Sequence, residues 1–352
     1  MKGKLTLYLA KTGQQMKTAI LANVIRGETI ESVHRGHVVA IDGNGKDVLT
    51  LGSPDMVTFF RSACKPFQAI PFITSGACEA LGISDEEVAL ACASHSGEPR
   101  HVRIAQLMLE RAGLNEAHLR CGAHLPFNEK EAERMQRAGE HPTQLHNNCS
   151  GKHAAMLVVA KHIDADLATY EDEENPVQQS ILKMIALFSE LPADQIKIGV
   201  DGCAAPNFAL PLSAMAKSFL NLISPPESFP SEVRDACGRI VSAMTSFPEL
   251  IGGLERLDTM LMQATDGKII SKVGADGVWL CAVLPGEEYP AGLAIALKIE
   301  DGDDRRARPV VAVQLLKKLG ILPPDALPEL SPMPIKNRRG DLVGRVEANA
   351  TI

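Results

Sequence analysis

The stretch 31-ESVHRGHVVAIDGNGKDVLTLG-52 decides how this chain is expected to fold. It contains two runs rich in β-branched residues, separated by Asp42-Gly43-Asn44-Gly45. Asp-Gly and Asn-Gly steps adopt the positive φ angles that tight hairpin turns need. The sequence therefore predicts two antiparallel strands that open the fold.

Most other strand-like segments lie near the opposite end of the chain. Apolar runs typical of strands occupy 267–274, 277–285 and 291–301, and two short strands are expected within 335–348. Strands from both ends must pair with each other to bury their edges. We therefore expect an α/β fold whose antiparallel sheet is built from both chain ends, within one unit over 19–352 preceded by an extension over 1–18.

A helical block is expected between the two sets of strands, over about 62–265. One short buried strand is predicted inside the block, at 196–203. A further helix is predicted after the block, at 305–321, with Pro309 near its first turn. The periodicity of apolar residues within the block predicts amphipathic helices at 98–114, 128–139, 150–163, 175–191 and 232–247.

Composition narrows the class of protein. The 352 residues are 45% hydrophobic and 22% charged, with a formal net charge of −7. No Lys/Arg stripe is present, which disfavours nucleic-acid binding, and no apolar run reaches the roughly 20 residues of a membrane span. The eight cysteines form no CxxC pair, as expected for reduced core residues of a cytoplasmic enzyme or binding protein.

The segment 61-RSACKPFQ-68 places Ser62 three residues before Lys65. Residues i and i+3 share a helix face, and a desolvated lysine can take the proton of a serine that attacks a carbonyl. A helix N-terminus at this point would offer backbone N–H groups to an oxyanion. The alternative is structural, with Ser62 as a helix cap and Lys65 on a solvated face.

Two later segments bear on that choice. Lys272-Val273-Gly274 ends an apolar strand, and an early S-x-x-K with a late K-x-G is the arrangement of penicillin-recognising serine hydrolases. The turn 91-ACASHSGEPR-100 supplies Ser94, which either caps the next helix or relays a proton, and His95 as a second, lower-ranked base.

Two cysteines lie in polar turns, in 145-LHNNCSGKH-153 and in 200-VDGCAAPN-207. Cys149 stands at a predicted helix start, where the pKa of a thiol falls, so it is a candidate nucleophile or metal ligand. Cys203 follows Asp201-Gly202 in the second turn. Two such cysteines and a third ligand are one way to hold zinc.

Taken in order, five segments resemble the asparaginase II family typified by the thermolabile rhizobial L-asparaginases. The resemblance implies a fold related to serine β-lactamases and glutaminases, a homodimer, and hydrolysis of L-asparagine to L-aspartate and ammonia. The segments are 61-RSACKPFQAIP-71, 91-ACASHSGEPRH-101, 146-HNNCSGKHAAML-157, 199-GVDGCAAPNFALPL-212 and 271-SKVGADGV-278.

Carried over residue by residue, the resemblance implies that Ser62 is the nucleophile and Lys65 its partner, within two Ser-Lys tandems that Ser94 and Lys272 complete. It further implies a Zn²⁺ ion that tunes substrate binding rather than activating water. Its implied ligands are Cys149, Cys203 and a neutral Lys152.

Four more residues in these segments are candidates for binding the charged ends of the substrate or for supporting the site: Arg61, Asn148, His153 and Asp201. Arg61 would suit a free carboxylate and Asp201 a free ammonium. The chain departs from the family pattern in its N-terminal extension and at Cys64, whose oxidation is expected to inhibit the enzyme.

Three alternatives remain open: a serine hydrolase of another amide (glutamine, a β-lactam or a small peptide), a non-catalytic homologue that binds zinc or a ligand, and an enzyme with Cys149 as nucleophile.

Overall fold

The computed structural model describes residues 17–352, so nearly all of the expected extension over 1–18 lies outside the described residues. The strands are β1 (Ala19–Arg26), β2 (Thr29–Asp42), β3 (Asp47–Leu51), β4 (Val57–Phe59), β5 (Lys197–Val200), β6 (Pro206–Pro211), β7 (Ile269–Gly274), β8 (Val278–Val283), β9 (Leu293–Ile299), β10 (Met333–Lys336) and β11 (Leu342–Ala348). The helices are α1 (Lys65–Gln68), α2 (Ile70–Thr74), α3 (Ala77–Ala80), α4 (Asp85–Ala91), α5 (Pro99–Arg111), α6 (Glu129–Ala138), α7 (Ser150–His162), α8 (Pro176–Ser189), α9 (Leu212–Ile223), α10 (Ser231–Ser246), α11 (Pro248–Ile251), α12 (Leu257–Ala264) and α13 (Ala307–Lys318).

The main sheet combines strands from both ends of the chain, as the sequence predicted. Its order is β10-β11-β1-β2-β9-β8-β7, with β3 paired to β2, and the pairings are antiparallel. The hairpin turn between β2 and β3 is closed by the Asp42 carboxylate, which accepts from the backbone N–H groups of Asn44 and Lys46, both at 2.9 Å. The expected fold class, an α/β protein with an antiparallel sheet from both ends, is confirmed.

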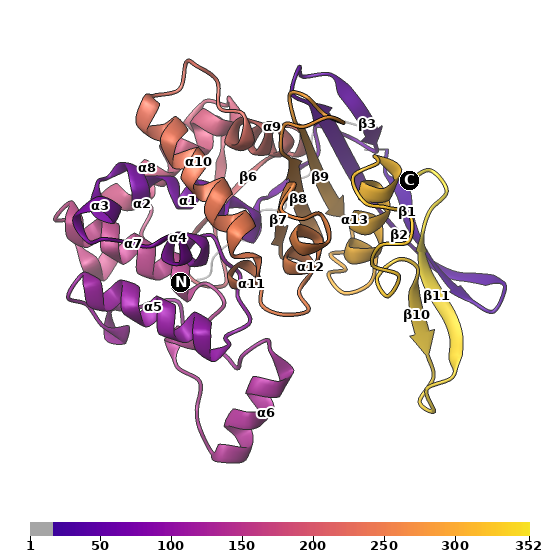
Figure 1. Cartoon of the computed structure of the whole chain (residues 1–352), viewed down its shortest axis with the longest axis horizontal. Helices are drawn as coiled ribbons and strands as arrows, with labels where there is room; N and C mark the ends of the chain where they lie inside the picture. The colour runs from indigo at the N-terminus through magenta and orange to yellow at the C-terminus, as the bar shows by residue number, and fades with distance from the viewer. Residues whose placement is uncertain (1–16) are drawn as a thin grey trace, which may run out of the picture.

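The helical block lies between these strands in sequence and beside them in space, with the sheet to its right in Figure 1. The predicted helices correspond to α5, α6, α7, α8 and α10, the later one to α13, and the predicted inner strand to β5. Three strands were not predicted: β1 at the start of the chain, and β4 and β6, which form a small sheet with β5. Prolines at both ends of β6 make it look like a loop in the sequence.

The prediction of an amphipathic helix over 150–163 was wrong in its pattern. Helix α7 is buried on every side from Ser150 to Ala160. A Cβ on Gly151 would lie 2.3 Å from the carbonyl oxygen of Leu90, so glycine lets α7 pack directly against α4. The polar residues of α7 therefore face the protein interior, where they must find partners.

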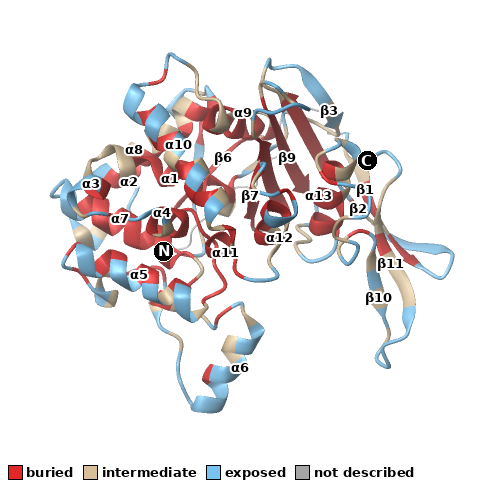
Figure 2. Ribbon diagram, in the orientation of Figure 1, coloured by how far each residue is buried: buried red, intermediate tan, exposed pale blue. Residues whose placement is uncertain are grey.

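The sheet is buried where it meets the helices. Strands β7, β8 and β9 are buried at every residue, as Figure 2 shows. Helices α9 and α13 both pack against this part of the sheet. Successive side chains of a strand point to opposite faces, so burial of every residue means that both faces are covered. No helix among residues 17–352 is long and apolar enough to cross a membrane.

Candidate active site

The site lies where β7 meets the 3₁₀ turn Arg61–Cys64 that precedes α1. Two hydrogen bonds hold this turn against β6: Phe60 N–H donates to the Phe208 carbonyl oxygen at 2.8 Å, and Arg61 N–H donates to Asn207 Oδ1 at 3.0 Å. A Cβ on Gly274 would lie 2.7 Å from the Phe60 carbonyl oxygen. Glycine at the end of β7 therefore allows the strand to approach the turn that carries Ser62.

A cavity of about 640 Å³ opens at this junction. Both candidate serines, Ser62 and Ser94, line it, and Asn148 lies at its wall. Pockets of this size suit small-molecule ligands. The other lining residues are Phe127, Glu129, Gly252, Glu255, Arg256, Leu257, Asp258, Met260, Val273, Gly274, Ala275, Asp304, Arg305, Arg308, Pro309, Leu330 and Met333.

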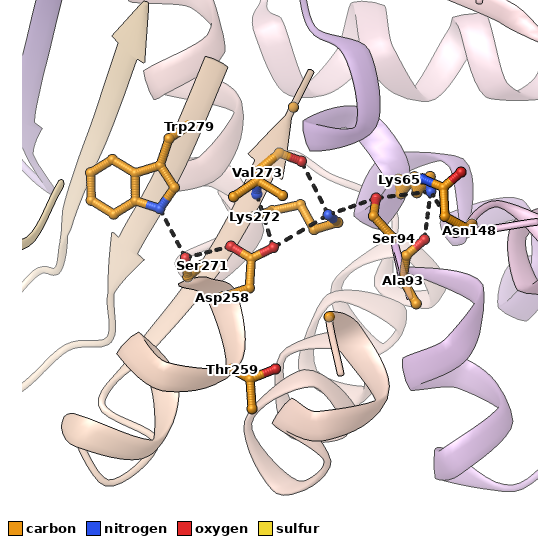
Figure 3. Close-up of polar contacts among 12 residues, drawn as sticks. Lys65, Ala93, Ser94, Asn148, Asp258, Thr259, Ser271, Lys272, Val273 and Trp279 are labelled. Atoms are coloured by element: carbon orange, nitrogen blue, oxygen red, sulfur yellow. Dashed lines mark hydrogen bonds and ion pairs between the residues drawn. The ribbon is translucent and has the colours of Figure 1, made fainter. Parts of the chain in front are cut away.

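Lys65 is buried and directed at Ser94. Its ammonium nitrogen lies 2.9 Å from Ser94 Oγ, 2.5 Å from the Ala93 carbonyl oxygen and 3.4 Å from that of Asn148 (Figure 3). The interpretation of Lys65 as a solvated helix residue is therefore wrong, and the turn's N-cap position is held by Phe60 rather than by Ser62. The structure brings Lys65 to Ser94 and gives it no hydrogen bond to Ser62.

Lys272 approaches the same hydroxyl from the sheet. Its amine nitrogen lies 3.0 Å from Ser94 Oγ, 3.1 Å from the Val273 carbonyl oxygen and 3.4 Å from Asp258 Oδ2. Burial, the largest cause, together with the charge of Lys65 lowers the pKa of Lys272 to about 8, against the opposing effect of Asp258. A lysine with such a pKa is partly neutral near physiological pH, and its neutral form is able to accept a proton from Ser94.

Asp258 is the site residue that the sequence gave no reason to select. Its buried carboxylate accepts from Ser271 Oγ at 2.7 Å and from the Val273 N–H at 3.0 Å, and Trp279 Nε1 donates to Ser271 Oγ at 2.9 Å. A polar row therefore runs from Trp279 to Lys65 (Figure 3). In sequence, Asp258 is one acidic residue in the first turn of α12, where such residues are common for their effect on the helix dipole.

Of the four substrate-binding candidates, Asn148 lines the cavity. Arg61 is paired with Asp201, at 3.0 Å, and with Asp276. His153 is buried, and its Nδ1 lies 2.7 Å from the Tyr170 hydroxyl. Within residues 17–352, the lining of the cavity includes none of Arg61, His153 and Asp201. The opposite charges of Arg61 and Asp201 neutralise each other.

His95, the lower-ranked base, is also buried away from the cavity wall. Its Nε2 lies 2.9 Å from Ser150 Oγ, and its Nδ1 accepts from the Gly97 N–H at 3.1 Å. Burial lowers the pKa of His95 well below its ordinary value. The contacts of this neutral ring are those of a structural residue joining the 94–97 loop to α7.

The three expected zinc ligands meet beneath the site. Lys152 Nζ donates a hydrogen bond to Cys203 Sγ at 3.0 Å, and the Cys149 thiol also forms a hydrogen bond with Cys203. Across residues 17–352, no three His, Cys, Asp or Glu side chains converge as a metal site, so a metal ion at this place needs the Lys152 amine. Cysteine sulfur is a common zinc ligand, whereas a lysine amine is an unusual one that binds a metal only after it has lost its proton.

The charge states of this cluster differ from expectation at Cys149 and at Lys152, whose raised pKa keeps it an ammonium, so a metal ion would have to displace its proton. The hydrogen bond to Cys203 raises the pKa of Cys149, and the same bond lowers the pKa of Cys203. Burial lowers the pKa of Lys152, but the neighbouring Cys203 and Cys149 outweigh burial and raise it. The thiolate therefore belongs to Cys203, and Cys149, at the start of α7, stays a thiol, which argues against it as the nucleophile.

Cys64 lies inside the Ser62 turn and is buried. Burial raises the pKa of its thiol to about 12. Thiols of this kind react slowly with oxidants, so the environment of Cys64 opposes the expected inhibition by oxidation. The described cysteines are all free and buried, as the sequence predicted.

Comparison with known proteins gives a match over nearly the whole chain. A family model described as L-asparaginase II matches residues 22–348. Similar solved structures include a probable glutaminase from Bacillus subtilis complexed with 6-diazo-5-oxo-L-norleucine (12% identity, TM-score 0.35, 82% of this chain and 85% of that chain). They also include Mglu in its L-glutamate binding form (16% identity, TM-score 0.37, 82% and 60% of the two chains). No curated protein matches the sequence.

Proposed function

We propose that this chain hydrolyses the side-chain amide of L-asparagine to L-aspartate and ammonia. The chain belongs to the L-asparaginase II family and is an amidohydrolase. The observation that carries the proposal is the convergence of two buried lysines on Ser94, in one cavity with Ser62. Burial lowers the pKa of Lys272 to about 8 beside the Ser94 hydroxyl, and perturbed groups of this kind are concentrated at catalytic sites.

In the first half of the reaction, Ser62 Oγ attacks the amide carbon of the substrate. Its proton passes to Ser94, which lines the same cavity, and then to the neutral amine of Lys272. The 3.0 Å contact between Ser94 Oγ and Lys272 Nζ supports the second of these transfers. The tetrahedral intermediate then collapses and the C–N bond breaks. The leaving nitrogen takes the proton back from Lys272 and departs as ammonia, leaving a β-aspartyl ester on Ser62.

In the second half, water attacks the ester carbon. The same relay of Ser94 and Lys272 takes the proton of the water, the bond between the carbon and Ser62 Oγ breaks, and the proton returns to Ser62. L-Aspartate leaves and the resting enzyme is restored. One base therefore serves both halves, since the two halves are chemically symmetrical.

Lys65 acts in this account as a fixed positive charge. As an ammonium it has three donors, and three acceptors surround it: Ser94 Oγ and the carbonyl oxygens of Ala93 and Asn148. It orients Ser94 with one of them and lowers the pKa of Lys272 through its charge. This division of labour, with Lys272 as base, departs from the expectation that Lys65 deprotonates Ser62 directly.

We also propose that Cys149, Lys152 and Cys203 hold Zn²⁺. The ion would supply a fixed positive charge beneath Asn148, which joins Cys149 to the cavity wall, and would tune substrate affinity. Elemental analysis of purified protein should give about one zinc per chain, falling to background in Cys203→Ala. Protein that contains no zinc after growth and dialysis with added zinc would contradict this proposal.

The test of the substrate is an amide panel. Wild-type protein is incubated with L-asparagine, L-glutamine, a β-lactam and a short peptide, and the release of ammonia, the opening of the ring or the appearance of a new amino group is measured. We expect the highest kcat/KM with L-asparagine, as the family match suggests, and a lower value with L-glutamine, whose extra methylene group would cost about 10- to 200-fold. Preferential hydrolysis of another amide would move the assignment to that substrate, and binding without turnover would favour the non-catalytic homologue.

A further inference from the structure

Arg308 is a buried cation that the reaction described above does not use. It is the second residue of α13 and is 7% exposed, yet it lines the cavity together with Ser62 and Ser94. Burying a guanidinium is costly unless its donors are satisfied. The contacts of this side chain therefore indicate what it is built to bind.

One side of the guanidinium is fixed by the protein. Nη1 donates to the Gly274 carbonyl oxygen at 2.6 Å and to that of Val278 at 3.4 Å, and it pairs with the Asp304 carboxylate. Asp304 also accepts the backbone N–H of Gly277 at 2.8 Å and that of Asp276 at 3.2 Å, so its charge is shared. These contacts orient the group and leave Nη2 without an acceptor among residues 17–352.

Nη2 is the part of the guanidinium that a ligand can reach. Nε is buried and closed to a ligand, whereas Nη2 has no acceptor among residues 17–352 and is not among the fully buried nitrogens. An N–H donor of a guanidinium forms a strong, charge-assisted hydrogen bond with a carboxylate oxygen. The open donor and the positive charge therefore suit an anionic group of a ligand.

The fixed side of Arg308 also places it beside the reacting groups. Gly274, whose carbonyl oxygen it binds, follows Val273, whose carbonyl oxygen accepts from Lys272. Lys272 in turn contacts Ser94. Arg308 and the proton relay are therefore attached to neighbouring residues of one strand end.

The other arginines near the site are less suited to a carboxylate. Arg61 is already paired with Asp201 and Asp276 and lies off the cavity wall. Arg256 lies over the ring of Phe127, with 5.4 Å from its guanidinium carbon to the ring centre. Arg305 lines the cavity but is exposed to solvent, which weakens its attraction for an anion.

We propose that Arg308 binds the α-carboxylate of the substrate through Nη2, and so restricts the enzyme to amides of free amino acids. This inference rests on the proposed function, because it assumes an amino-acid substrate in the same cavity. It assigns the recognition of the carboxylate to Arg308 in place of Arg61. Arg308 is thus a specificity-determining residue that contacts the substrate away from the scissile bond.

The test compares L-asparagine with 3-aminopropanamide, which has the same amide but no α-carboxylate. Arg308→Gln keeps a donor for the Gly274 carbonyl oxygen and removes the cation, and Arg308→Lys keeps the charge but not the planar head that holds Gly274 with Nη1 while Nη2 stays open. For Arg308→Gln we expect KM for L-asparagine to rise about 10- to 100-fold with little change in kcat, and kcat/KM for 3-aminopropanamide to stay within about twofold. Arg308→Lys should lie between wild type and Arg308→Gln.

Arg306→Met is the matched control, because Arg306 carries the same charge two residues away, is exposed and lies off the cavity wall. It should leave both substrates unchanged. Equal losses on both substrates in a folded Arg308→Gln or Arg308→Lys protein, judged by the melting temperature, would overturn the proposal. So would an unchanged KM for L-asparagine.

Calorimetric binding of L-aspartate separates this inference from the proposed function. A wild-type protein that hydrolyses no amide but binds L-aspartate, with binding weakened at least tenfold in Arg308→Gln, would overturn the hydrolase while supporting the carboxylate site. L-Aspartate affinity that is equal in wild type and Arg308→Gln would overturn the carboxylate site whatever the turnover.

Discussion

At the scale of single residues, the chemistry depends on the protonation of Lys272. Burial lowers its pKa to about 8 and Asp258 opposes that effect. Since the neutral amine is the base, kcat/KM should rise with pH through an apparent pKa near 8, and activity should be lost as the pH falls below it.

Asp258→Asn tests this assignment. Removing the carboxylate removes the charge that favours the ammonium form of Lys272, so the pKa of Lys272 falls further and the rising limb of the pH profile moves to lower pH. The measurement is kcat/KM for L-asparagine from pH 5 to 10. Asp266→Asn, an exposed acidic residue following α12, is the control and should leave the profile in place. A profile that falls in amplitude but keeps its midpoint would mean that Asp258 is only structural.

Residue identities were more predictable than residue partners. Ser62, Lys65, Ser94 and Lys272 were selected from two short motifs and one polar turn, and the structure brings the two lysines to Ser94. Lys65 points toward Ser94 rather than Ser62 because of how the loop at Ala93 and Ser94 packs. Ala93, whose carbonyl oxygen accepts from Lys65, lies 28 residues after it in the chain. No local pattern carries that information.

Asp258 and Arg308 were missed for the same reason. Each stands in the first turn of a helix, α12 and α13. Asp258 looks in sequence like an ordinary acidic residue at such a position, and Arg308 follows two other arginines and belongs to no motif. What distinguishes them is burial against β7 and β8, which is set by tertiary structure. The reversed charge assignment of Cys149 and Cys203 has a similar origin, because the hydrogen bond between them joins two distant turns.

At the scale of elements, the site depends on the close approach of β7 to the 3₁₀ turn. Gly274→Ala would place a Cβ 2.7 Å from the Phe60 carbonyl oxygen and 3.0 Å from the Cβ of Val278. We expect a loss of about 1–3 kcal/mol in the free energy of unfolding and a fall in kcat/KM, since the displaced turn carries Ser62. Denaturant unfolding and L-asparagine turnover measure the two effects.

Gly238→Ala is the matched control. Gly238 lies within α10, and a Cβ there meets no atom within 4 Å. Alanine is the better helix former by about 1 kcal/mol, so this variant should be slightly more stable with unchanged turnover. If Gly274→Ala behaved like Gly238→Ala, the close approach of strand and turn would not be needed for the site.

The long elements were predictable because their apolar periodicity is local. Helices α5, α6, α8 and α10 each present such a pattern, and the Asp42-Gly43-Asn44-Gly45 turn identified the hairpin between β2 and β3. Helix α7 was found but given the wrong pattern, since a helix buried on every side has no polar face. Short strands between prolines, such as β6, carry too little signal.

At the scale of the whole molecule, the reaction centre is assembled from segments far apart in sequence. The turn at Ser62, the loop at Ser94 and strand β7 meet at one cavity, and β7 is fixed there by a sheet whose strands come from both chain ends. The sequence supported the sheet from both ends because unpaired strand edges are unfavourable. It did not indicate where the cavity would open, which depends on how the helical block packs beside β7.

The central claim is that Ser62 is the nucleophile of an amidohydrolase that acts on L-asparagine. Its most direct test is ammonia release from L-asparagine by wild type and by Ser62→Ala, with the fold of both checked by their melting temperatures. The account predicts turnover by wild type and a loss of more than about 1,000-fold in the folded variant. Turnover that survives in Ser62→Ala, or its absence in the wild type, would contradict it.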